Sequence, residues 1–156
     1  MEEGFGAYGT IHYELKDEFG NTKQDVTTQN VITNYHDAVM AAKMNNSLGS
    51  VIAFIDFGKT AFSTGTAAET GMNVGFQGDS RNIVSRVTAG GGDDNDVVCT
   101  VTIPAAEYTG TIQEAGLFLT SSTSDMMCYA HFPDVNITKG AADTLAVTWT
   151  ITYGAS

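Results

Sequence analysis

The chain has 156 residues, a length typical of one domain, of which 42% are hydrophobic and 16% are charged. This composition is too apolar for a disordered segment, and no stretch approaches the roughly 20 apolar residues of a membrane-spanning helix. Its 18 acidic and 7 basic residues give a net charge of -11, which repels a phosphate backbone. We therefore expect one globular domain, covering residues 1–156, that binds neither nucleic acid nor a membrane.

The N-terminus and the cysteines indicate the compartment. Met1-Glu2-Glu3-Gly4 is acidic, whereas a secretory signal begins with basic residues and an apolar run. We expect an intracellularly made protein that is not processed. Cys99 and Cys128 fall within apolar alternating segments, where a free thiol commonly packs as a small hydrophobe. The sequence therefore predicts buried thiols, with a disulfide as the alternative.

The N-terminal half predicts two strands and one helix. The strands cover residues 8–15 and 22–32, joined by a turn-rich link. Thr33 or Asn34 can cap the helix, which residues 38–44 favour through their alanines and methionines. The apolar run 50–57 has the length of a strand, and the glycine- and threonine-rich stretch 58–78 predicts a long surface loop.

Alternation in the C-terminal half decides the fold class. Large residues occupy every second position from Leu145 to Tyr153, which predicts a half-buried strand with Trp149 as its core anchor. Residues 97–103 repeat this period, and Pro104 then removes a backbone donor and ends the ladder.

Further strands are predicted over residues 81–88, 112–119 and 128–132, with a hairpin tip at 89–95 and a bulge near Gly116. Short strands, short turns and one helix together favour a mostly β fold. We predict an antiparallel β-sandwich, jelly-roll-like, with one inserted α-helix, and a closed barrel as the alternative.

Motifs for catalysis are incomplete. Gly58-Lys59-Thr60 resembles the end of a phosphate-binding loop, but Ala53 stands where that motif needs its first glycine. Glu107 and Glu114 lie on consecutive predicted segments without a sign that they face one cleft. The chain has no Gly-x-Ser-x-Gly elbow, and neither cysteine has the setting of a known nucleophile. We predict no catalytic residues, no cofactor and no enzymatic activity.

Metal binding is not favoured either. The run Asp93-Asp94-Asn95-Asp96 lacks the spaced carboxylates and distal glutamate of a calcium loop, and predicts a solvated turn. His12, His36 and His131 lie on three different predicted elements, whereas zinc needs three or four convergent ligands. Five tyrosines could instead line a sugar-binding face, although core or interface packing is commoner for aromatic side chains. They are Tyr8, Tyr13, Tyr108, Tyr129 and Tyr153.

Several segments carry a resemblance to a known group. Ile112-Gln113-Glu114-Ala115-Gly116-Leu117-Phe118 and Leu145-Ala146-Val147-Thr148-Trp149-Thr150-Ile151 resemble strands of tailed-bacteriophage virion proteins, which carry Ile-x-Glu-Ala-Gly-Leu-Phe and then Leu-x-Val-x-Trp-x-Ile. Asn30-Val31-Ile32-Thr33-Asn34 and Ile55-Asp56-Phe57-Gly58 are similar to the same group. The resemblance spans most of residues 30–153.

This resemblance implies a structural virion component assembled in the host cytoplasm. It favours a capsid decoration protein that binds the major capsid protein or other virion proteins, because the chain lacks the long shaft of a fibre. The alternative is a tail, fibre or baseplate module that recognises a host-surface glycan. A homo-oligomer is expected, with a trimer as one arrangement.

Residues 1–9 carry aromatic side chains ahead of any strong turn signal. We predict that they form an N-terminal arm that contacts neighbouring subunits. The partner-binding residues predicted on this basis are Phe5, Tyr8 and Tyr13.

Overall fold

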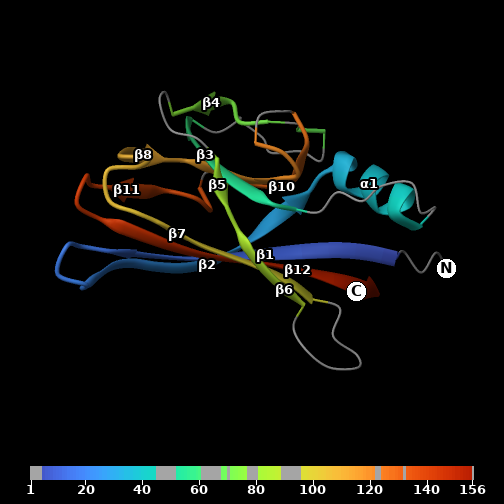
Figure 1. Cartoon of the computed structure of the whole chain (residues 1–156), viewed down its shortest axis with the longest axis horizontal. Helices are drawn as coiled ribbons and strands as arrows, with labels where there is room; N and C mark the ends of the chain where they lie inside the picture. Colours follow the sequence, from blue (N-terminus) through green and yellow to red (C-terminus); the bar gives the residue numbers. More distant parts are fainter. Residues whose placement is uncertain are drawn as a thin grey trace.

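The computed structural model describes residues 5–44, 52–60, 68–69, 71–76, 81–88, 96–121, 124–131 and 133–155 (Figure 1). Within these ranges the chain is mostly β with one short helix, α1 (Asn34–Met44). The strands are β1 (Phe5–Lys16), β2 (Thr22–Ile32), β3 (Phe54–Thr60), β4 (Val74–Gly75), β5 (Asn82–Ile83), β6 (Ser85–Thr88), β7 (Asp96–Ile103), β8 (Gly110–Ile112), β9 (Glu114–Phe118), β10 (Met126–His131), β11 (Ile137–Lys139) and β12 (Thr144–Ala155).

The strands form one antiparallel, curled sheet and a small separate pair. The order in the sheet is β4-β3-β9-β10-β2-β1-β12-β7-β6, with β5 also pairing with β3, while β11 pairs with β8. β2 joins the two parts of the sheet, because most of it pairs with β1 whereas its last residues, Val31 and Ile32, pair with β10. We call β2, β1, β12, β7 and β6 the β1 half, and β10, β9, β3, β4 and β5 the β9 half.

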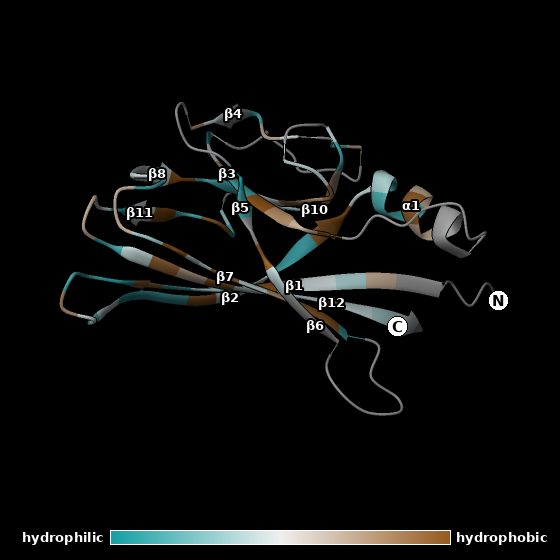
Figure 2. Cartoon of the chain, in the orientation of Figure 1, coloured by the Kyte–Doolittle hydropathy of each residue, from teal (hydrophilic) through white to brown (hydrophobic). Residues whose placement is uncertain are grey.

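The two halves face each other across a shared core, and hydrophobic residues recur along strands of both (Figure 2). The removal of these apolar side chains from water is the main contribution to the stability of such a sheet. The β1 half contributes Ile11, Tyr13, Leu15, Cys99, Ile103, Leu145, Val147, Trp149 and Ile151 to the buried cluster. The β9 half contributes Ile55, Phe57, Ala115, Leu117, Cys128 and Ala130.

Several sequence predictions are confirmed by this arrangement. In β12 the alternating residues Leu145, Val147, Trp149 and Ile151 are buried, while those between them are partly exposed. The Oγ1 of Thr33 accepts a hydrogen bond from the His36 N–H at 3.2 Å and so caps α1. Both cysteines are buried free thiols.

Other elements differ from their predictions. The segment expected to be one strand over 81–88 is divided, since β5 pairs with β3 and β6 pairs with β7. The chain crosses between the halves at Val84, which is buried and whose N–H donates to the Ala53 carbonyl at 3.0 Å. β4 and β11 were not predicted, and the strand expected over 50–57 lies at Phe54–Thr60. The predicted hairpin tip at 89–95 and residues 61–67, 70, 77 and 78 of the predicted loop at 58–78 lie outside the described residues. The described part of that loop includes the end of β3 and the whole of β4.

β9 and β10 are covered on both faces. Every residue of β9 is buried, because a second cluster covers the face that points away from the shared core. This cluster contains Phe118, Met126 and Tyr129, with Phe54 and Met72 packed against it.

Candidate interaction surface

The outward side of the β1 half is a broad surface rich in threonine. Along β1 the side chains alternate, so that Ile11 and Tyr13 point into the core while Thr10 and His12 point out. The strand registers place outward residues side by side across β2, β1, β12 and β7. We call the central part of this surface the threonine face; it consists of Tyr8, Thr10, His12, Thr27, Gln29, Val98, Thr100, Thr102, Thr148, Thr150 and Thr152. The strand registers place Glu14, Asp25, Asp96 and Ala146 on the same side around it.

Charged side chains lie at the margins of the threonine face. The His12 Nε2 lies 2.7 Å from an Asp25 carboxylate oxygen. Lys16 Nζ lies 3.3 Å from Glu14 at the end of β1. Asp96 lies on the same side, opposite Thr152, and accepts a hydrogen bond from the Thr152 hydroxyl at 2.6 Å. The threonine face itself therefore contains no carboxylate, lysine or arginine, although the net charge of the chain is -11.

The predicted partner-binding residues have different positions. Tyr8 lies on the threonine face with 52% of its surface exposed, opposite Thr152 of β12. Tyr13 is 2% exposed and its hydroxyl donates to the Asp134 carbonyl at 3.3 Å, so it belongs to the core. Burial raises the pKa of Tyr13. The side chain of Phe5 lies outside the described part of the chain.

The predicted N-terminal arm coincides in part with β1. Residues 5–9 form the first part of this strand and pair with residues 151–155 of β12. They are therefore held by the sheet, while residues 1–4 lie outside the described ranges.

Two exposed aromatic residues were missed by the sequence reasoning. Phe19, in the turn between β1 and β2, is 81% exposed, and Tyr35 at the start of α1 is 36% exposed. An aromatic residue inside a turn-rich link is the signal that could have indicated Phe19.

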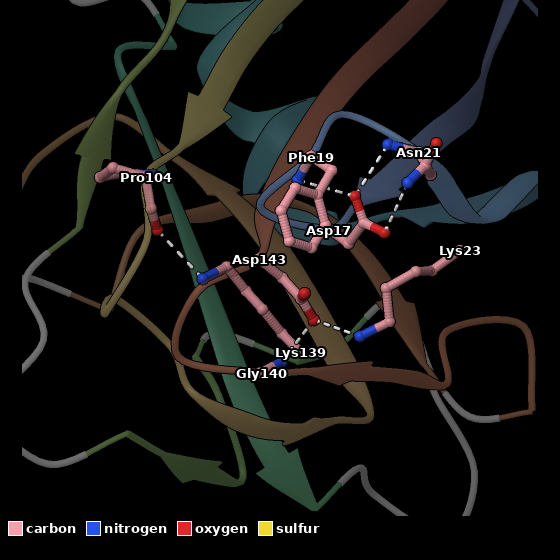
Figure 3. A network of polar contacts seen from close by, with 8 residues as sticks. All are labelled: Asp17, Phe19, Asn21, Lys23, Pro104, Lys139, Gly140 and Asp143. Atoms are coloured by element: carbon pink, nitrogen blue, oxygen red, sulfur yellow. Dashed lines mark hydrogen bonds and ion pairs between the residues drawn. The ribbon is translucent and has the colours of Figure 1, made fainter.

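The turn that carries Phe19 is held by Asp17, as Figure 3 shows. The Asp17 carboxylate accepts hydrogen bonds from the backbone N–H groups of Phe19 at 2.9 Å and Asn21 at 2.8 Å. It also accepts one from the Asn21 side chain at 3.0 Å. These hydrogen bonds, those from Asn21 first, lower the pKa of Asp17.

A neighbouring polar cluster holds the turn before β12 (Figure 3). Asp143 accepts a hydrogen bond from Lys23 Nζ at 2.5 Å and from the Gly140 N–H at 2.7 Å, which lowers its pKa. Lys139 is 1% exposed and donates to the Pro104 carbonyl at 3.0 Å. The charges of this cluster bind its own turns together, which indicates a structural role.

The outer side of the β9 half buries an acidic group. Glu114 has no exposed surface and accepts a hydrogen bond from the Tyr129 hydroxyl at 2.8 Å. The Tyr129 ring stacks on His131 with 5.6 Å between centroids. Gly58 of β3 is the cross-strand partner of Glu114, and a Cβ at Gly58 would overlap the Glu114 carboxylate. Glu107 has different surroundings, because it accepts a hydrogen bond from Asn82 at 3.0 Å.

Arg81 joins several loops on the same side of the sheet. Its guanidinium lies 3.5 Å from the centroid of the Phe118 ring and donates to the Thr120 carbonyl at 2.8 Å. Asp56 and Asp125 each lie 3.4 Å from it. Because the arginine is flanked by two carboxylates and largely buried, this group is also best explained as structural.

A buried histidine connects α1 to β12. The His36 Nε2 lies 2.9 Å from the Tyr153 hydroxyl, and the two rings stack with 5.5 Å between centroids. Burial lowers the pKa of His36 and raises that of Tyr153 to about 12. The hydrogen bond and the stacked rings hold the helix against the sheet.

Comparison of the chain with protein-family models, curated proteins and solved structures finds no match. Within the described ranges, no group of three or more His, Cys, Asp or Glu side chains could hold a metal ion. α1 is too short and too polar to cross a membrane, and the described residues contain no other helix.

Proposed function

We propose that this protein is a non-enzymatic structural component of a tailed-bacteriophage virion. In this proposal it is assembled in the host cytoplasm, binds the outer surface of the capsid and stabilises the shell. Its partners are the major capsid protein or other virion proteins, and it acts as a homo-oligomer, of which a trimer is one form. The sequence resemblance supports this assignment, and the structural observation that carries it is the threonine face.

The threonine face has the chemistry of a surface that packs against another protein. The central parts of protein interfaces are depleted in charged residues and enriched in tyrosine. Threonine offers a methyl group for packing and a hydroxyl group for hydrogen bonds, and here it is held on rigid strands. A rigid surface loses little conformational entropy on binding, so even a modest contact area gives useful affinity.

Many identical copies would add to the effect of each contact. A shell presents the same binding surface repeatedly, and linked weak contacts give an avidity above that of any single one. This explains how a small domain without a catalytic centre could increase the resistance of a particle to internal pressure.

The finer fold assignment is part of the same proposal. We infer that the curled sheet belongs with β-sandwiches of the jelly-roll type, because its two halves face each other over one core. A jelly roll is a common architecture of virion proteins that must pack side by side.

The alternative is a tail, fibre or baseplate module that recognises a host-surface glycan. Tyr8 favours it, since an exposed aromatic ring beside threonine hydroxyls can stack on a sugar and hydrogen-bond to it.

Particles prepared with and without the protein test the two functions. We expect particles without it to form, but to rupture at lower temperature and under milder osmotic shock. Thr150→Glu places a charge in the centre of the threonine face and should abolish binding to particles. Thr138→Glu, at an exposed site on β11, is the matched control and should bind normally. Unchanged particle stability together with lost host adsorption would overturn the decoration assignment in favour of glycan recognition.

A further inference from the structure

β2 has one edge that no described strand covers. Residues 22–30 pair with β1 along their other edge, in the long hairpin visible in Figure 1. Contact with β10 begins only at Val31 and Ile32. Among the residues that the structure describes, no strand pairs with the second edge of residues 22–30.

Solvent exposure supports an open edge. The inward side chains of β1, such as Ile11 and Leu15, are 1% exposed. The inward side chains of β2, among them Gln24, Val26 and Thr28, remain partly exposed although they point to the same side of the sheet. Gln24 also donates a hydrogen bond from its side chain to the Asn136 carbonyl at 3.1 Å, so the loop before β11 contacts this part of β2. The contact comes from a side chain and leaves the backbone groups of this edge available for an added strand.

An open edge usually carries features that prevent pairing with another chain. Natural proteins place charges, prolines or bulges there. In β2 the charges are Lys23, whose ammonium group lies 2.5 Å from the Asp143 carboxylate, and Asp25, which lies 2.7 Å from His12. Lys23 is also the extra residue of the register shift against β1, so these features all lie near one end of the free edge. The rest, Val26-Thr27-Thr28-Gln29-Asn30, has no charge, no proline and no glycine. This second part is a template for an added strand.

The edge is complementary to itself. We propose that β2 pairs antiparallel with β2 of a second copy, with the two-fold axis at Val26. This register places all of residues 22–30 opposite one another, with a local irregularity at Lys23. It places Lys23 opposite Gln29 of the other copy and Asp25 opposite Thr27, so that like charges are never directly opposite. An isologous contact of this kind closes on itself as a dimer.

Such a contact would join the threonine faces of two copies into one continuous surface. It goes beyond the proposed function, because edge pairing requires neither a capsid nor a glycan. The two can therefore fail separately: the dimer is tested in solution, and capsid binding is tested on particles.

The register predicts opposite effects for one substitution at two neighbouring exposed positions. In Thr27→Lys the new ammonium group faces Asp25 of the other copy, whereas in Gln29→Lys it faces Lys23. Each pair occurs twice in the dimer, so we expect Thr27→Lys to lower the dissociation constant by about two- to thirtyfold. Gln29→Lys should raise it by a smaller factor, because Asp143 of the same copy partly neutralises Lys23. If the added lysine acted only by reducing the net negative charge of each copy, both variants would associate more strongly than the parent.

Sedimentation of the full chain over a range of concentrations measures the dimer constant. Thr138→Lys is the control for added charge away from the edge, and thermal melting verifies that each variant folds. Thr27→Arg and Gln29→Arg repeat the test if either lysine variant unfolds. The proposal is supported by a dimer whose constant moves in opposite directions in the two variants. A monomer at every concentration, a trimer, or equal effects at both positions would overturn it.

Discussion

At the scale of single residues, Trp149 is the largest fully buried side chain. Trp149→Ala should cost about 3–5 kcal/mol of unfolding free energy, because it leaves a cavity between the two halves of the sheet. The indole Nε1 has no hydrogen-bond partner among the described residues, so Trp149→Phe should cost distinctly less. Urea unfolding of both variants measures the difference. An alanine variant that melts within a degree or two of the parent would contradict the core assignment.

His36 should make stability depend on pH near neutrality. Its pKa is lowered by burial, so below its ordinary value of 6.5 the unfolded chain binds more protons than the folded one. Stability from this group is therefore present at higher pH and is lost as the pH falls from about 6.5 through the folded pKa. The melting temperature should decrease between pH 7.5 and pH 5.5.

His36→Phe is the control for this effect, because it keeps an aromatic ring against Tyr153 and cannot bind a proton. The variant should show a smaller decrease over the same interval, although it lacks the hydrogen bond to the Tyr153 hydroxyl. An equal decrease in both proteins would assign the pH dependence to other groups.

At the scale of elements, the pairing of β3 with β9 depends on the absence of a side chain at Gly58. A Cβ there would overlap the buried Glu114 carboxylate, so Gly58→Ala should destabilise the fold by about 1–3 kcal/mol. Gly75 of β4 is its direct cross-strand partner and has open space around it. Gly75→Ala should therefore change stability by less than about 0.5 kcal/mol. Thermal melting of the two variants is the test, and equal losses would disprove the packing explanation.

α1 and the turns depend on local polar contacts, some of which could be predicted from the sequence. The Thr33 cap follows from a short hydroxyl residue placed before a helix-forming run. The Asp17 turn was recognisable from its composition, since aspartate and asparagine commonly bond to nearby backbone groups. Lys139 and Asp143 were not recognisable in this way, because their partners Pro104 and Lys23 are distant in the sequence.

At the scale of the whole molecule, stability should not require a metal ion. Of the acidic run 93–96, only Asp96 lies among the described residues, and it already accepts a hydrogen bond from Thr152 at 2.6 Å. Adding EDTA should leave the melting temperature unchanged. A decrease that calcium reverses would show that the acidic run binds this ion.

The sequence by itself determined the fold class and the orientation of its clearest strands. The alternation of large and small residues from Leu145 to Ile151 identified a strand and its inward face, because the side chains of a strand with one face in the core alternate with period two. The same rule placed Cys99 in the core.

Tertiary structure decided the features that depend on distant segments. β9 is buried on both faces because a second cluster covers it, and nothing within five residues of Glu114 predicts that a glutamate lies there without exposed surface. Tyr8 and Tyr13 have similar local settings but lie on opposite faces of β1. Tyr13 faces the core and is buried, whereas Tyr8 faces outward and is exposed. The free edge of β2 was also invisible in the sequence, since strand order depends on which segments meet after the chain has folded.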